Sequence, residues 1–131
     1  MGLESIYEGY LLHYGQPRLF APADRDTAVL LGDYLYAHGL VRIASQGEVD
    51  VVADLAELLS VCAQLRAENR PGDGAAWAAT VACLGGSVLL EAARTMLRDG
   101  GDASELRELA ALEAGADAVE QALALHAGRV D

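Results

Sequence analysis

The sequence predicts an all-α protein, a bundle of about five helices. No long stretch alternates apolar and polar residues as a half-buried strand would. Five segments instead repeat their apolar residues every three or four positions, which is the helical interval. Short clusters of Gly, Pro, Ser and Asp separate these segments, and such short connections are typical of a helical bundle.

The first two predicted helices flank an irregular segment. Apolar and aromatic residues recur with helical spacing over residues 3–14, and a Gly-Gln-Pro sequence ends this helix at residues 15–17. Asp24 is a good N-terminal cap for the next helix, which we expect over residues 25–44. Apolar side chains occur all round this second helix, so we expect it to be deeply buried.

Three further helices are predicted over residues 49–69, 75–98 and 104–126. A Pro-Gly-Asp-Gly sequence at 71–74 is the strongest break in the chain, and two adjacent glycines at 100–101 form another. Gly85 and Gly86 lie inside the helix 75–98, where we expect a kink or a close-packing point. Ser104 is expected to cap the last helix.

The charge balance excludes several functions. The 131 residues include 20 acidic and nine basic residues, for a net charge of -11, and every basic residue is arginine. A nucleic-acid backbone or an anionic membrane surface would be repelled by such a protein. Chemistry that needs a lysine, such as a Schiff base, would require another chain to supply it.

The composition predicts one helical domain over residues 1–131. The chain is 53% hydrophobic but only 5% aromatic, and 25 alanines favour helices that pack closely. We expect no membrane insertion, since the longest uncharged run, residues 74–90, is shorter than a bilayer span. No basic-then-apolar leader is evident, so a cytoplasmic location is expected. Cys62 and Cys83 lie among apolar residues and are expected to be buried free thiols, with a disulfide as the alternative.

Two rows of acidic residues are candidate sites for a divalent cation. Each row has the spacing i, i+4, i+7 within a predicted helix: Asp50, Asp54 and Glu57, and then Glu113, Asp117 and Glu120. Hard cations prefer several carboxylate oxygens on one side. A solvated helix face has the same appearance, and we favour that interpretation for both rows. Neither row has a histidine at i+3, so a di-iron site is not supported.

The other residue types with catalytic potential form no recognisable motif. His13, His38 and His126 stand at no metal-ligand spacing, and each is expected to be a partly exposed polar side chain. No serine or cysteine lies in a nucleophile motif, and the absence of lysine excludes a Walker-type phosphate loop.

A family resemblance rests on two runs of residues: Gly15-Gln16-Pro17, and Thr27-Ala28-Val29-Leu30-Leu31-Gly32-Asp33-Tyr34-Leu35. They resemble an element of the trans-isoprenyl diphosphate synthases, or polyprenyl synthetases. In that family, Arg-Arg-Gly-x-Pro leads through a loop into a buried helix that carries Ala-x-x-x-x-Gly-Asp-x-Leu. The resemblance implies a helical fold around a cavity for a growing prenyl chain, of which this chain is the central part.

The departures from the family pattern fall on its catalytic parts. The first aspartate-rich motif would correspond to residues 4–8, where Glu4 and Glu8 replace the outer acids and Ser5 replaces a middle one. The arginine pair that grips diphosphate would fall on His13 and Tyr14. The family's phosphate-binding lysine would fall on Asp73, which we expect to have no nearby cation.

The position expected for the second aspartate-rich motif reads Ala124-Leu125-His126-Ala127-Gly128, with no aspartate. The family reaction ionises an allylic diphosphate, whose leaving charge must be neutralised by metal ions and cations. The resemblance therefore implies no catalysis by this chain alone, no cofactor of its own, and Mg²⁺ only where a partner chain supplies the site.

Within this family, the chain is similar to the small non-catalytic subunits of heteromeric long-chain polyprenyl diphosphate synthases. Such a subunit would pair with a larger catalytic chain and affect the length or release of the product. The family dimerises through helices that correspond here to residues 25–44 and 49–69. The expected helix-pairing or cavity face consists of apolar residues and one histidine: Leu31, Tyr34, Leu35, His38, Leu55, Leu58 and Leu59.

Two alternatives stay open from the sequence. The chain is alternatively a self-associating helical module that binds an apolar or isoprenoid ligand without chemistry. A residual enzyme that binds Mg²⁺ through Glu4 and Glu8 is the third interpretation.

Overall fold

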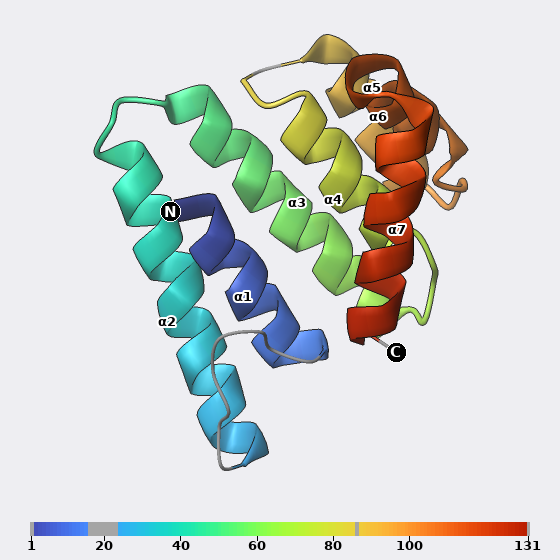
Figure 1. The fold of residues 1–131 in the computed structure, drawn as a ribbon. Coiled ribbons are helices and arrows are strands. Elements are labelled where there is room, and N and C mark those ends of the chain that lie inside the picture. Colours follow the sequence, from blue (N-terminus) through green and yellow to red (C-terminus); the bar gives the residue numbers. More distant parts are fainter. Residues whose placement is uncertain (1, 16–23, 86, 131) are drawn as a thin grey trace. The chain divides into compact units, whose positions relative to one another are not determined.

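The computed structural model describes residues 2–15, 24–85 and 87–130. These residues form seven helices and no strand, which confirms the all-α class (Figure 1). The helices are α1 (Gly2–Tyr14), α2 (Arg25–Ala44), α3 (Val49–Ala67), α4 (Asp73–Ala82), α5 (Val88–Arg98), α6 (Ser104–Ala114) and α7 (Ala116–Val130). Two compact units are distinguished, Met1–Val52 with Ala127–Asp131, and Ala53–His126. The prediction of a single domain stays a prediction.

The helix expected over 75–98 is two helices, α4 and α5. α4 ends at Ala82, and Gly85 adopts a φ of +108°, a backbone conformation that helices do not contain, so the helix breaks here rather than kinking. Ser87 then caps α5, because its side chain accepts a hydrogen bond from the backbone N–H of Leu90 at 3.2 Å.

The helix expected over 104–126 is also two helices, α6 and α7, because Gly115 has a φ of +93° and ends α6. Ser104 is the first residue of α6 and does not cap it, contrary to expectation. Asp102 instead accepts hydrogen bonds from the backbone N–H and the hydroxyl of Ser104, at 3.0 and 2.6 Å. A short polar side chain thus organises this turn from two residues upstream.

In the first unit, α1 and α2 pack antiparallel with their backbones in close approach (Figure 1). A Cβ atom on Gly39 would lie 2.5 Å from the carbonyl oxygen of Gly2, and one on Gly2 would lie 2.9 Å from that of Gly39. Two helical turns further along both helices, a Cβ on Gly9 would lie 2.8 Å from the carbonyl oxygen of Gly32. Only glycine permits the two backbones to approach this closely at either contact.

Side-chain contacts complete the α1–α2 pair. Leu12, Ala28 and Leu35 form a buried apolar cluster, against which Leu31 packs. The Arg25 guanidinium donates to the carbonyl oxygens of Leu12, at 3.2 Å, and His13, so it caps the last turn of α1. These contacts fix how far α1 extends along α2.

The second unit has a core of small and aliphatic side chains. Its α4 packs on α6, and α5 packs on both. The core includes fully buried residues of several helices: Leu55, Leu58, Cys62, Ala76, Ala79, Leu90, Leu106 and Ala110. The Arg70 guanidinium donates to the carbonyl oxygens of Leu97 and Gly101 at 2.5 and 3.1 Å, which satisfies the C-terminal end of α5.

The glycine contact predicts the effect of adding one methyl group. Gly32→Ala would drive a Cβ into the His13 ring and to 3.0 Å from the carbonyl oxygen of Gly9. We expect a loss of about 1–3 kcal/mol in the free energy of unfolding, measured by urea denaturation with circular dichroism. Gly128→Ala is the matched control, since a Cβ at this helical glycine meets nothing within 4 Å. It should instead stabilise by about 0.5–1 kcal/mol, and equal effects of the two changes would contradict this account.

The cap of α2 predicts a pH dependence. Asp24 accepts a hydrogen bond from the backbone N–H of Thr27 at 2.8 Å, and this bond, aided by the Thr27 hydroxyl, holds the pKa of Asp24 below 3.8. A lowered native pKa adds stability that is present above the unfolded-state pKa and is lost as pH falls through the native one. The stability difference between the unmodified protein and Asp24→Ala should therefore be constant near neutral pH and shrink below about pH 4. Asp24→Asn, a neutral cap, should keep its advantage over Asp24→Ala at low pH.

Candidate functional site

The residues at the degenerate aspartate-rich motif lie on α1. Glu4 is exposed and Ser5 is half-buried, whereas Glu8 is only 1% exposed. The two carboxylates therefore do not share a solvent-facing surface, although they lie one helical turn apart. Among residues 2–15, 24–85 and 87–130, no group of three or more His, Cys, Asp or Glu side chains is arranged to hold a metal ion.

The two acidic rows differ in their exposure to solvent and in the helices that carry them. Asp50 and Glu57 are exposed, but Asp54 between them is 4% exposed, so the expectation of a solvated face is wrong for Asp54. Glu113 ends up on α6, whereas Asp117 and Glu120 are on α7, because Gly115 separates these helices. All three of the latter are exposed.

Asp54 neutralises a buried arginine in the second unit. Its Oδ1 accepts a hydrogen bond from Nη1 of Arg94 at 3.2 Å, and its Oδ2 accepts one from the backbone N–H of Gly85 at 2.9 Å. The two charged side chains are 6% and 9% exposed. This carboxylate therefore joins α3 to α5 and to the turn after α4. A signal was present in the sequence, since Asp54 precedes Leu58 and Val61 by four and seven residues on the buried face of α3.

A second carboxylate that contacts an arginine lies half-buried at the start of α4. Oδ2 of Asp73 accepts a hydrogen bond from Nη2 of Arg66 at 2.6 Å and lies 3.0 Å from Nε2 of His126. The expectation that Asp73 has no nearby cation is therefore wrong. His126 is 7% exposed and not a partly exposed side chain as expected, because it packs against this carboxylate. The carboxylate of Asp73 therefore interacts with Arg66 and His126, two residues of its own unit.

The two other histidines lie in the first unit. His13 is half-buried, and its ring stacks on Tyr36 with the ring centres 5.1 Å apart. Its Nε2 lies 3.0 Å from Oδ1 of Asp33. His38 is exposed and stacks on Tyr34, with ring centres 5.8 Å apart and planes 13° apart.

The residues of the predicted pairing or cavity face separate into two groups. Leu35, Leu55 and Leu58 are buried in the cores of their units, and Leu31 and Leu59 are half-buried. Tyr34 is 61% exposed, and His38 is exposed as well. Tyr34 and His38 are therefore the most accessible residues of the predicted face.

Tyr34 and His38 belong to a longer row on the outer face of α2. Leu30 is 71% exposed and Val41 is 67% exposed, and the four residues follow one another at intervals of four, four and three. We refer to Leu30, Tyr34, His38 and Val41 as the α2 outer stripe. The expectation that α2 is deeply buried is therefore wrong for this face. The prediction also missed Leu30 and Val41, although their spacing from Tyr34 places them on the same face.

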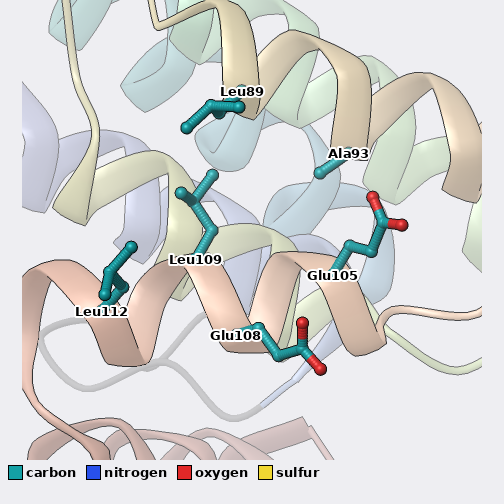
Figure 2. A pocket seen from close by; sticks show the side chains of 6 residues that line it. All are labelled: Leu89, Ala93, Glu105, Glu108, Leu109 and Leu112. Carbon is teal, nitrogen blue, oxygen red and sulfur yellow. The ribbon is translucent and has the colours of Figure 1, made fainter.

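One hollow of the second unit lies between α5 and α6 and has a volume of about 260 Å³ (Figure 2). Its lining consists of Leu89, Ala93, Glu105, Glu108, Leu109 and Leu112. None of these six residues belongs to the predicted pairing or cavity face.

Both cysteines are free thiols, in agreement with expectation. Cys62 is buried as expected, whereas Cys83 is only half-buried because it follows the last residue of α4. Burial raises the pKa of the Cys83 thiol above 9.0, and the negative charges of Glu113 and Asp54 raise it further. No helix within the described ranges is long and apolar enough to cross a membrane.

The Asp54–Arg94 pair predicts a strong asymmetry between removing one charge and removing both. Asp54→Asn leaves the buried guanidinium without its counter-charge and should lower the free energy of unfolding by about 3–5 kcal/mol. The double variant Asp54→Leu with Arg94→Met removes both charges and should lose much less. Glu57→Gln is the control, since its 3.6 Å pair with Arg98 is partly exposed and should be worth about 0–1 kcal/mol. Chemical denaturation measures all three, and a double variant as unstable as Asp54→Asn would contradict the prediction.

No protein-family model matches the chain, and no curated protein or solved structure is significantly similar to it. The resemblance to the polyprenyl synthetases therefore stays a prediction from the quoted residues. Of these, Gln16 and Pro17 lie outside the residues that the structure describes. Gly32, the glycine of the Gly-Asp pair, forms the close contact between α1 and α2.

Proposed function

We propose that the protein is a non-catalytic, polyprenyl-synthetase-like subunit. It binds a larger catalytic prenyl diphosphate synthase through the α2 outer stripe and affects the length or release of the product. The proposal includes a cytoplasmic location and a helical arrangement like the central part of the isoprenoid synthase fold. The exposed stripe is the observation that carries it.

The stripe has the properties of a helix-pairing surface. Leu30, Tyr34 and Val41 are all more than 60% exposed and stand on one face of a single helix. Monomeric proteins rarely expose large contiguous apolar patches, and such patches commonly mark protein–protein contacts. Apolar residues at intervals of three and four are the anchors by which one helix docks into the groove of another protein.

The opposite face of α2 gives the stripe a rigid support. Gly32 and Gly39 are in contact with the backbone of α1, and Leu35 is buried in the cluster with Leu12 and Ala28. A surface whose supporting side chains are already locked loses little conformational entropy when a partner binds. This division of α2 into a fixed inner face and an apolar outer face favours a role in assembly.

The placement of charges favours a division of labour with a catalytic partner. Arg66 contacts Asp73, Arg70 contacts Glu68, and Arg94 contacts Asp54, so these cations are engaged within the protein. Glu8 is buried away from Glu4 on α1. Under the proposal, the partner supplies the Mg²⁺ and the cations that neutralise a diphosphate leaving group.

The proposal predicts a loss of association when the stripe is charged. The partner to test is a prenyl synthase chain with both aspartate-rich motifs, first of all one encoded beside this protein. Tyr34→Asp should weaken its binding by about tenfold or more, and should abolish any change that the unmodified protein makes in product length or yield. Affinity is measured by biolayer interferometry, and prenyl products are measured by chromatography.

Leu125→Asp is the matched control, because Leu125 on α7 is a similarly exposed apolar residue at 59%. It should leave association and product unchanged. No association of the unmodified protein with such a partner would overturn the proposal. A homodimer that Tyr34→Asp dissociates, seen by sedimentation velocity without binding to the synthase, would assign the stripe to a second copy and would also overturn it.

A further inference from the structure

A groove with an apolar half and an acidic half runs between α5 and α6. The two helices pack against each other, and Ala93 and Leu109, at 4% and 9% exposure, line its base. Leu89 and Leu112 form its rim and are 65% and 78% exposed. Figure 2 shows Leu89, Leu109 and Leu112 together at one end of the groove, while Glu105 and Glu108 lie toward the other.

The acidic half carries negative charge that no salt bridge among the described residues neutralises. Glu105 and Glu108 are exposed, stand three residues apart on α6, and form no salt bridge with any residue of the described chain. The arginines of α5 are engaged elsewhere. Arg94 pairs with Asp54, and Nη2 of Arg98 donates to the Ser60 hydroxyl at 2.5 Å.

We infer that this groove binds an amphipathic helix of a partner protein, with apolar residues one turn apart and Lys or Arg beside them. Leucine-type side chains of the partner would pack among Leu89, Leu109 and Leu112. Its basic side chains would face Glu105 and Glu108. The groove shares no residue with the α2 outer stripe, and the inference does not depend on the proposed function.

Size and charge favour a helix over the other occupants. The volume of about 260 Å³ is below the range of about 300–1,000 Å³ typical of small-molecule sites, but it accommodates individual side chains of a docked helix. The carboxylates repel diphosphates, nucleic acids and anionic lipid surfaces. A cationic helix gains from the same charges, which accelerate association and orient the bound partner.

The test uses a fluorescein-labelled model peptide of leucine and lysine, with the leucines at helical spacing, and the full-length protein. Fluorescence anisotropy should show saturable binding that weakens as salt is added. Leu112→Asp should weaken this binding by about tenfold or more, because it places a charge among the apolar contacts. Glu105→Lys with Glu108→Lys should weaken it by a similar factor and should allow a leucine–glutamate peptide to bind.

Matched controls separate the groove from the general acidity of the protein. Asp117→Lys with Glu120→Lys makes the same change in net charge at the same spacing, on exposed residues of α7. Leu125→Asp adds the same charge at another exposed leucine, also on α7. Both controls, and Tyr34→Asp on α2, should bind the leucine–lysine peptide as the unmodified protein does.

Four outcomes would overturn the inference. They are no peptide binding, equal losses in the groove and control variants, equal binding of the leucine–glutamate peptide by the unmodified protein, and self-association that Leu112→Asp abolishes. The last outcome, measured by sedimentation velocity, would assign the groove to a second copy. Circular dichroism of each variant checks that a loss of binding is not a loss of fold.

Discussion

The contact on which the first unit depends is the close approach of two backbones, where Gly2 meets Gly39 and Gly9 meets Gly32. Helices that approach this closely have no room for a side chain between them, so the glycines decide which faces meet. That choice places Leu35 in the apolar cluster and leaves Tyr34, the preceding residue, on the outside. The exposed stripe of α2 is therefore a consequence of a packing rule on its other side.

The second unit holds ion pairs that are wholly or partly withdrawn from water. Asp54 and Asp73 each meet an arginine, and each also accepts a hydrogen bond from a backbone N–H group, of Gly85 and Gly74 respectively. A buried pair such as Asp54–Arg94 adds little net stability, but leaving one of its charges without the other is costly. The Asp54–Arg94 pair also holds the Arg94 guanidinium away from the surface. Arg94 is therefore not available to pair with Glu105 and Glu108 of the groove.

The elements that were predictable from the sequence depend on local chemistry. The bounds of α2 and its cap at Asp24 follow from an oxygen-bearing side chain before an uninterrupted helical segment, and the structure confirms both. The breaks at Gly85 and Gly115 were missed, since glycine costs a helix only about 1 kcal/mol and packing decides whether it continues. The burial of Asp54 and the exposure of Leu30 depend on which neighbours a helix acquires. Periodicity identifies a face of a helix, but the neighbouring helix determines whether that face meets water.

The glycines of α1 and α2 are spaced equally, since seven residues separate Gly2 from Gly9 and Gly32 from Gly39. If α1 slid along α2 by two turns in either direction, only one glycine couple would meet, Gly9 with Gly39 or Gly2 with Gly32. A slide of one turn would bring a glycine against a larger side chain. The native alignment is therefore the only one that joins both couples. Each glycine constrains the sliding position of the whole helix as well as its own surroundings.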